Sequence, residues 1–159
     1  VGRHISKGAF PHRSLSILAA AYARGIPATL HVAVGADIVH MHPGAQEGDG
    51  GAVLGRAAFR DFQVFSEAVQ GLDGGGVYLN LGSAVIMPEV FLKAVNIARN
   101  LEGKPHGIVT ANLDMLQHYR PRENVVQRPP IPGGRGFQIT GHHEILFPLL
   151  YTMVRDRLS

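Results

Sequence analysis

The stretch from 74 to 100, GGGVYLNLGSAVIMPEVFLKAVNIARN, constrains the fold more than any other part of the chain. Val77–Leu81 is short, apolar and rich in residues that favour strands, and Gly82-Ser83 follows as a turn. Pro88 then opens a helical pattern, with Glu89 placed to complement the helix dipole. A strand, a turn of small residues and a helix in succession present backbone N–H groups that favour an anion or phosphate. We therefore expect the floor of a nucleotide or substrate site here.

Strand-like and helix-like patterns alternate along the rest of the chain. Short β-favouring runs lie at Ala28–Val34, His106–Leu113 and Phe137–Ile139. Helical spacing of apolar residues predicts helices between Leu15 and Gly25, over Val53–Val69, from Pro88 onward, and between Ile145 and Met153. This alternation is typical of an α/β fold, and we expect a three-layer, Rossmann-like arrangement with a mostly parallel sheet and helices on both faces.

Length and composition predict a single α/β domain spanning residues 1–159. Hydrophobic residues make up 45% of the chain and charged residues 17%, which suits helices that cover a buried sheet or a subunit contact. We therefore expect a homo-oligomer, with the Phe-bearing helix Val53–Val69 contributing to the contact. The chain starts with Val1 rather than Met, a start that fits a fragment of a longer chain.

Several classes of protein are disfavoured by what the sequence lacks. The absence of cysteine excludes disulfides, thiolate metal sites and a thiol nucleophile, and it fits a cytoplasmic protein. The sequence has neither a signal peptide nor an apolar run of transmembrane length, so we expect no membrane partner. The formal net charge is only +3 and most Arg residues are scattered, so we do not expect a nucleic-acid partner.

Polar or small residues follow each of the predicted strands. Because the carboxyl ends of parallel strands meet at one edge of a sheet, we expect these residues to line a shared crevice. The expected cofactor-binding residues are Gly82, Ser83, Ala84, Asn112 and Asp37. The crevice would take a small-molecule nucleotide or substrate.

These assignments have plainer structural alternatives. Gly82-Ser83-Ala84 forms either a phosphate cradle or an ordinary strand-to-helix turn. Asn112 either binds a ligand amide or ribose, with Asp114 as acceptor or base, or the two residues form an Asx turn that caps the strand.

The histidines allow a metal-dependent hydrolase as a different function. Asp37, His40 and His42 lie in one loop, and imidazole and carboxylate groups are ligands for zinc or similar ions. Further candidates for such a site are His142, His143 and Glu144. No HExxH helix is present, and surface or hydrogen-bonded histidines are the alternative. His31, inside a predicted strand, is expected to be a core histidine.

The segment 115–136 carries Arg residues and prolines without clear periodicity, as functional or mobile loops do. Its Arg residues either grip phosphate groups or belong to a solvated loop or subunit contact; they are Arg120, Arg122, Arg128 and Arg135. No GxSxG, Walker A or GxGxxG pattern is present, which disfavours serine hydrolases, P-loop NTPases and ordinary dinucleotide-binding Rossmann proteins.

Several segments are similar to those of one known group of proteins. LNLGSAVIMPEVF is similar to the sirtuin succession of a strand, a GAG-type turn and IPDF, and VTANLDMLQHY is similar to the sirtuin strand end TQNIDGLH. IPATLHVAVGADIVHMH and the glycine triplet 74–76 look like segments of deoxyhypusine synthase. The chain thus resembles the deoxyhypusine synthase and sirtuin-like group of NAD-binding α/β proteins.

This resemblance implies a parallel sheet with NAD at its carboxyl edge. It would place the Gly82-Ser83-Ala84 turn near the phosphates, and Asn112 and Asp114 near the nicotinamide and ribose. Deoxyhypusine synthase uses a catalytic lysine in its C-terminal part, whereas no lysine follows Lys104 here. Sirtuins hold a zinc module with cysteines, which this chain lacks. Neither specific activity is therefore expected.

The sequence leads first to an NAD-type nucleotide-binding protein that could act as an NAD-dependent enzyme. The titratable candidates for acid–base chemistry are Asp114, His118 and His142. One alternative is the metal-dependent hydrolase, using Asp37, His40, His42 and His142. The other is a non-catalytic oligomer subunit whose glycine turns only pack.

Overall fold

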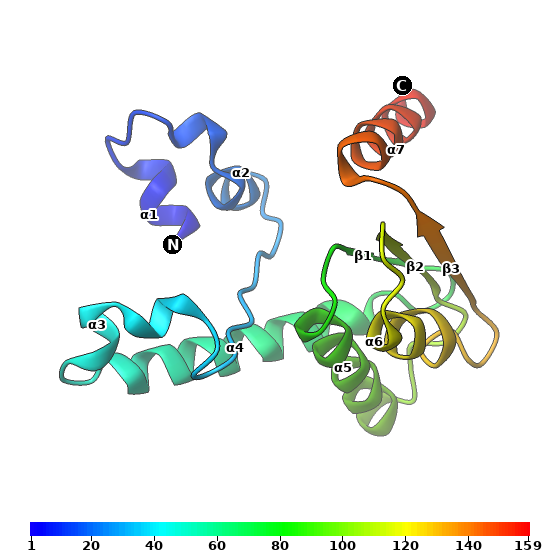
Figure 1. The fold of residues 1–159 in the computed structure, drawn as a ribbon, viewed down its shortest axis with the longest axis horizontal. Coiled ribbons are helices and arrows are strands. Elements are labelled where there is room, and N and C mark those ends of the chain that lie inside the picture. The colour runs from blue at the N-terminus through cyan, green and yellow to red at the C-terminus, as the bar shows by residue number, and fades with distance from the viewer. The chain divides into compact units, whose positions relative to one another are not determined.

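The structure is a computed structural model that describes all residues from Val1 to Ser159. The chain forms two compact units, Val1–Phe65 and Ser66–Ser159. The division falls within the long helix α4, Gly50–Gln70 (Figure 1). The sheet belongs entirely to the second unit, whereas the sequence predicts one α/β domain over the whole chain.

The first unit is built from short helices that precede α4. They are α1 (Gly2–Lys7), η1 (Arg13–Leu15), α2 (Ile17–Ala23), η2 (Ile38–Met41) and α3 (Pro43–Gln46). Ser16 caps α2, because its hydroxyl accepts a hydrogen bond from the N–H of Ala19. The predicted helices between Leu15 and Gly25 and over Val53–Val69 are confirmed by α2 and α4.

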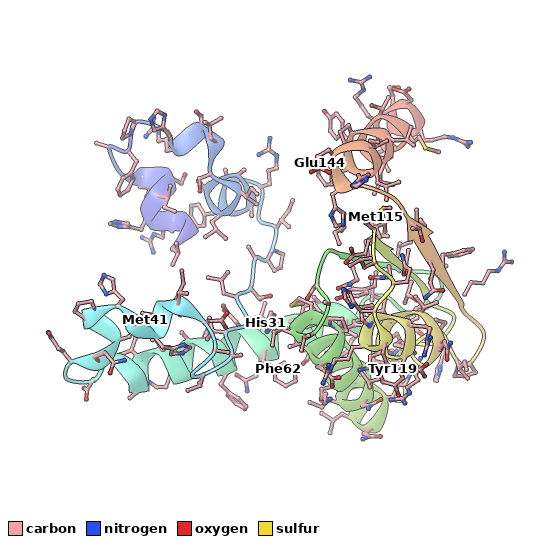
Figure 2. All side chains as sticks on the ribbon, in the orientation of Figure 1. His31, Met41, Phe62, Met115, Tyr119 and Glu144 are labelled. Carbon is pink, nitrogen blue, oxygen red and sulfur yellow. The ribbon has the colours of Figure 1, made fainter.

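The predicted strand at Ala28–Val34 is wrong. A strand needs a neighbour for its backbone N–H and C=O groups, and the first unit contains no other strand. The segment lies beside α4 instead (Figure 2). The N–H of Leu30 donates to Oδ2 of Asp61 at 2.9 Å, and the His31 ring packs edge-on against Phe65 with ring centroids 5.2 Å apart.

The second unit contains a three-stranded parallel sheet with the order β1-β2-β3. The strands are β1 (Val77–Leu81), β2 (Val109–Asp114) and β3 (Arg135–Thr140). The predicted strands at 77–81 and 106–113 are confirmed, and the predicted run at 137–139 lies within β3. The α/β class with a parallel sheet and helices is therefore confirmed, and the arrangement is compatible with a three-layer, Rossmann-like fold.

One face of the sheet is covered by helices, and the core of the second unit lies there. The covering elements are α5 (Ile86–Glu102), α6 (Tyr119–Pro121) and the π-helix η3 (Arg122–Gln127) (Figure 1). The Tyr78 ring stacks on fully buried Phe91 of α5, with ring centroids 3.6 Å apart. Thr110 of β2 donates its hydroxyl hydrogen to the carbonyl of Val125 in η3 at 2.6 Å.

The opposite face of the sheet, called the open face below, is apolar: its central side chains Ala111 and Leu113 are buried, and the outer strands leave side chains partly exposed. Because side chains alternate along a strand, Leu79 and Leu81 project away from the covered face, as do Phe137 and Ile139 in register. These four side chains are 37 to 46% exposed.

The last helix, α7 (His143–Leu158), follows β3 and confirms the predicted helix between Ile145 and Met153. Pro148 lies inside α7 without ending it. The helix leaves several large apolar side chains exposed, among them Phe147 and Leu149. None of the helices in the structure combines the length and the apolar character that a membrane crossing requires.

Candidate functional site at the carboxyl edge of the sheet

The turn between β1 and α5 presents unpaired backbone N–H groups. The N–H of Gly82 donates to the carbonyl of Leu113 at 3.2 Å, whereas those of Ser83, Ala84 and Val85 have no acceptor in the structure. The Ser83 hydroxyl accepts a hydrogen bond from the N–H of Met87 at 3.1 Å and so caps the first turn of α5. The N-terminus of this 17-residue helix also carries a partial positive charge. The turn therefore offers free donors in a field that favours an anion.

The start of α7 lies against the same turn. The N–H of Gly141, just before α7, donates to the carbonyl of Asp114 at the end of β2, at 3.4 Å. The His143 ring is so close to Gly82 that a Cβ on this glycine would lie 3.0 Å from Cε1 of His143. Figure 2 shows Met115, which follows β2, and Glu144, in the first turn of α7, in this part of the unit. Two strand-to-helix connections therefore meet at the carboxyl edge of the sheet.

His143 has a defined place at this edge. Its Nε2 lies 2.8 Å from the carbonyl oxygen of Leu113. A carbonyl oxygen can only accept a hydrogen bond, so Nε2 carries the hydrogen. Sequence reasoning treated His143 only as a candidate metal ligand and assigned acid–base work to its neighbour His142. His143 could have been identified from its position just after a strand end. That position becomes visible only when the full extent of β3, Arg135–Thr140, is known.

The amide side chains of Asn80, Asn112 and Gln117 form a chain of hydrogen bonds that holds the turn in place. Nδ2 of Asn80 donates to Oδ1 of Asn112 at 2.7 Å and to the carbonyl of Ser83 at 2.9 Å. Nδ2 of Asn112 donates to Oε1 of Gln117 at 2.8 Å, and Nε2 of Gln117 donates to the carbonyl of Asp114 at 3.0 Å. Asn112 is fully buried, so the surface of the site is formed by the turn above it. Oδ1 of Asn80 is buried without a hydrogen-bond donor.

Most of the residues predicted from the sequence come together here. They are Gly82, Ser83, Ala84, Asn112, Asp114 and His142. Oδ1 of Asp114 accepts from the N–H of Leu116 at 3.2 Å, which is the Asx turn named above as the alternative. His142 is exposed directly before α7, and His118 is exposed directly before α6.

Asp37 does not follow a strand of this sheet. It lies in the first unit, where its carboxylate accepts a hydrogen bond from the N–H of Ala33 and closes a turn. The predicted convergence of Asp37 with Ser83 and Asp114 is therefore wrong as a convergence of strand ends, because the strand before Asp37 does not form. The third strand end at the carboxyl edge is that of β3.

The metal hypothesis gains no support from the geometry. No three His, Asp or Glu side chains lie close enough together to hold a metal ion. Nδ1 of His40 hydrogen-bonds to the carbonyl of Asp37 at 3.0 Å, and Nδ1 of His42 accepts from the N–H of Gly44 at 3.1 Å. Both histidines thus stabilise turns of their own loop.

The Arg residues that follow β2 pair with protein carboxylates. Nε of Arg120 lies 3.5 Å from Oε1 of Glu89 on α5. Arg122 and Arg128 lie 3.3 and 3.9 Å from the carboxylate of Glu123. A phosphate gripped by these side chains would have to compete with the carboxylates, whereas the N–H groups of the turn after Gly82 have no competing acceptor.

The first unit holds a cavity of about 560 Å³. Its wall is mainly apolar, with Leu18 from α2 and Leu54 from α4, and it includes the carboxylate of Asp61. The size suits a small ligand. The wall also includes Arg3, so it carries one cationic and one anionic side chain.

Known proteins give no independent guide to the site. No protein-family model matches the chain, and comparisons with curated proteins and with solved structures found no match. The resemblance to the deoxyhypusine synthase and sirtuin-like group therefore stays a prediction from short motifs.

Proposed function

We propose that the unit Ser66–Ser159 binds a nucleotide of the NAD type at the carboxyl edge of its parallel sheet. The observation that carries the proposal is the set of free N–H groups at Ser83, Ala84 and Val85 in front of α5. Such a turn favours phosphate because its N–H groups and the helix dipole both attract negative charge. Ligands of open parallel sheets characteristically bind at this edge.

Three titratable side chains predicted from the sequence are the candidates for acid–base chemistry in this proposal. Asp114 ends β2, and His142 directly precedes α7, whose first residue contacts the turn. His118 stands at the start of α6. If the nucleotide serves as a cosubstrate, one of these three groups would act as the acid or base.

Calorimetric titration of the full chain with NAD and with ADP-ribose tests the proposal. The variant Ala84→Asp places a carboxylate in front of α5, where it competes for the N–H groups while it favours the helix itself. We expect it to weaken binding at least about tenfold, which corresponds to about 1.4 kcal/mol. The control Leu101→Asp, near the other end of α5, should bind as the wild type does. Absence of binding of both ligands to the wild type at millimolar concentration would refute the proposal.

We also propose that copies of the chain associate through the open face of the sheet. This keeps the homo-oligomer prediction but moves the contact from the helix Val53–Val69 to side chains around Leu79 and Phe137. Exposed apolar patches of this kind mark interaction surfaces. If association is observed and no nucleotide binds, the non-catalytic subunit becomes the favoured function.

A further inference from the structure

We infer that His143 selects a ribosyl ligand by accepting a hydrogen bond from a sugar hydroxyl at its Nδ1 atom. The inference rests on the proposed function and deepens it, because it names the group that distinguishes a nucleotide from a bare phosphate.

The orientation of the ring comes from its bond to β2. Nε2 of His143 donates to the carbonyl of Leu113 at 2.8 Å, so the neutral ring carries its lone pair on Nδ1. No protein donor reaches Nδ1 in the structure, and the side chain is half-buried rather than enclosed. Nδ1 is therefore available to accept a hydrogen bond from a ligand.

The position of the ring comes from its contact with Gly82. A Cβ at Gly82 would contact the edge of the imidazole tightly, with Cε1 at 3.0 Å and Nδ1 at 3.7 Å. The residues that follow Gly82, from Ser83 to Val85, carry the free N–H groups. The His143 ring thus lies against the residue that directly precedes the row of donors. A fully ionised phosphate supplies only acceptors and cannot use Nδ1, whereas a ribosyl phosphate supplies both phosphate oxygens and hydroxyl donors.

A second acceptor under the turn also lacks a donor. Asn80 is 2% exposed, and its Nδ2 holds the carbonyl of Ser83, but its Oδ1 has no partner. Buried polar atoms in native proteins are nearly always satisfied, so an exception calls for an explanation. Because this oxygen is buried beneath the turn, a ligand at the surface does not reach it, and the inference rests on Nδ1 of His143.

The test compares two ligands and two variants of the full chain by calorimetry. ADP-ribose carries phosphates and ribose, and inorganic pyrophosphate carries phosphates only. His143→Gln keeps an N–H group near the position of Nε2, and so the bond to Leu113, but it lacks an acceptor in the place of Nδ1. We expect it to bind ADP-ribose about tenfold more weakly and pyrophosphate within about twofold of the wild type. His143→Ala, which loses the bond to Leu113 as well, should weaken both ligands.

Each other outcome has a definite meaning. Wild-type affinity of His143→Gln for ADP-ribose overturns the inference, and so does an equal loss for both ligands, which would show that His143 only holds the turn. Wild-type binding of pyrophosphate without ADP-ribose leaves an anion site and overturns both the inference and the NAD-type proposal. If the wild type binds neither ligand, the proposed function itself fails, and the inference fails with it.

A spectroscopic measurement on the wild type covers the case in which a variant does not fold. The ¹⁵N signal of His143 Nδ1 should move when ADP-ribose is added and stay in place with pyrophosphate. The same response to both ligands, or no response to ADP-ribose that binds, contradicts the inference.

Discussion

Two features of the structure favour glycine at position 82: its backbone conformation and its contact with His143. Its φ of +68° lies in the left-handed region, and a Cβ at this position would lie only 3.0 Å from Cε1 of His143. Gly103, after α5, has a similar φ of +69° but open space around it. We predict that Gly82→Ala destabilises the second unit by about 2–4 kcal/mol, from backbone strain plus displacement of His143. Gly103→Ala should cost only the strain, about 1–2 kcal/mol. Equal losses in urea unfolding would contradict the packing of His143 on Gly82.

His31 gives the first unit a predictable response to acid. Burial lowers the pKa of His31 from its ordinary value of 6.5, and the nearby Asp61 partly offsets this. The unfolded chain therefore binds the proton more readily, so stability should fall as the pH drops below about 6.5 and level off below the folded-state pKa. Urea unfolding, followed by NMR signals of the first unit, measures this. His31→Asn should flatten the dependence between those two pKa values, and an unchanged slope would contradict the burial of His31.

At the scale of elements, the amide chain joins β1, β2 and the segment that follows β2. Asn112→Ala removes the acceptor of Asn80 and the donor to Gln117 inside a buried site. We predict a loss of about 2–4 kcal/mol, because buried polar groups are left unpaired. Gln138, its register partner on β3, is exposed, and Gln138→Ala should cost no more than about 0.5 kcal/mol. A loss in Asn112→Ala as small as this control would show that the amides are not coupled.

The elements that could be predicted are those whose signals are local. Val77–Leu81 and the helix after it follow from alternation, a glycine turn and helical spacing, and all three lie within one stretch of chain. Ala28–Val34 has the composition of a strand, but a strand also depends on a partner, which no local pattern reveals. The spacing of apolar residues also does not predict the π-helix η3, which packs against α5 and β2, elements distant from it in the sequence.

For the candidate site, the sequence predicts the turn after β1 but not the side chains that pack against it. Gly82 and Ser83 are marked by their residue types, which local chemistry explains. Which of the two adjacent histidines, His142 or His143, contacts the turn depends on the direction of the backbone at the end of β3. The sequence does not reveal that direction. The paired state of Arg120 depends on Glu89 of α5, which the Arg residue meets only in the folded unit. The bond from Lys93 is the main cause that lowers the pKa of Glu89.

For the whole molecule, the open sheet face predicts self-association. Sedimentation velocity should show a species larger than the monomer that becomes more populated as the concentration rises. Leu79→Asp puts a charge on the open face and should shift the chain to monomer. Leu101→Asp alters a side chain on α5 that is 74% exposed, and it should leave the association unchanged. A wild type that sediments only as a monomer would contradict the proposal.

We propose that the turn after β1 receives the phosphates of a nucleotide. An NMR titration of the ¹⁵N-labelled chain with ADP-ribose tests it most directly. We expect the amide signals of Ser83, Ala84 and Val85 to move to lower field and to saturate together, because their free N–H groups gain acceptors. Signals that stay in place at these three residues while ADP-ribose binds elsewhere, or does not bind, would contradict it.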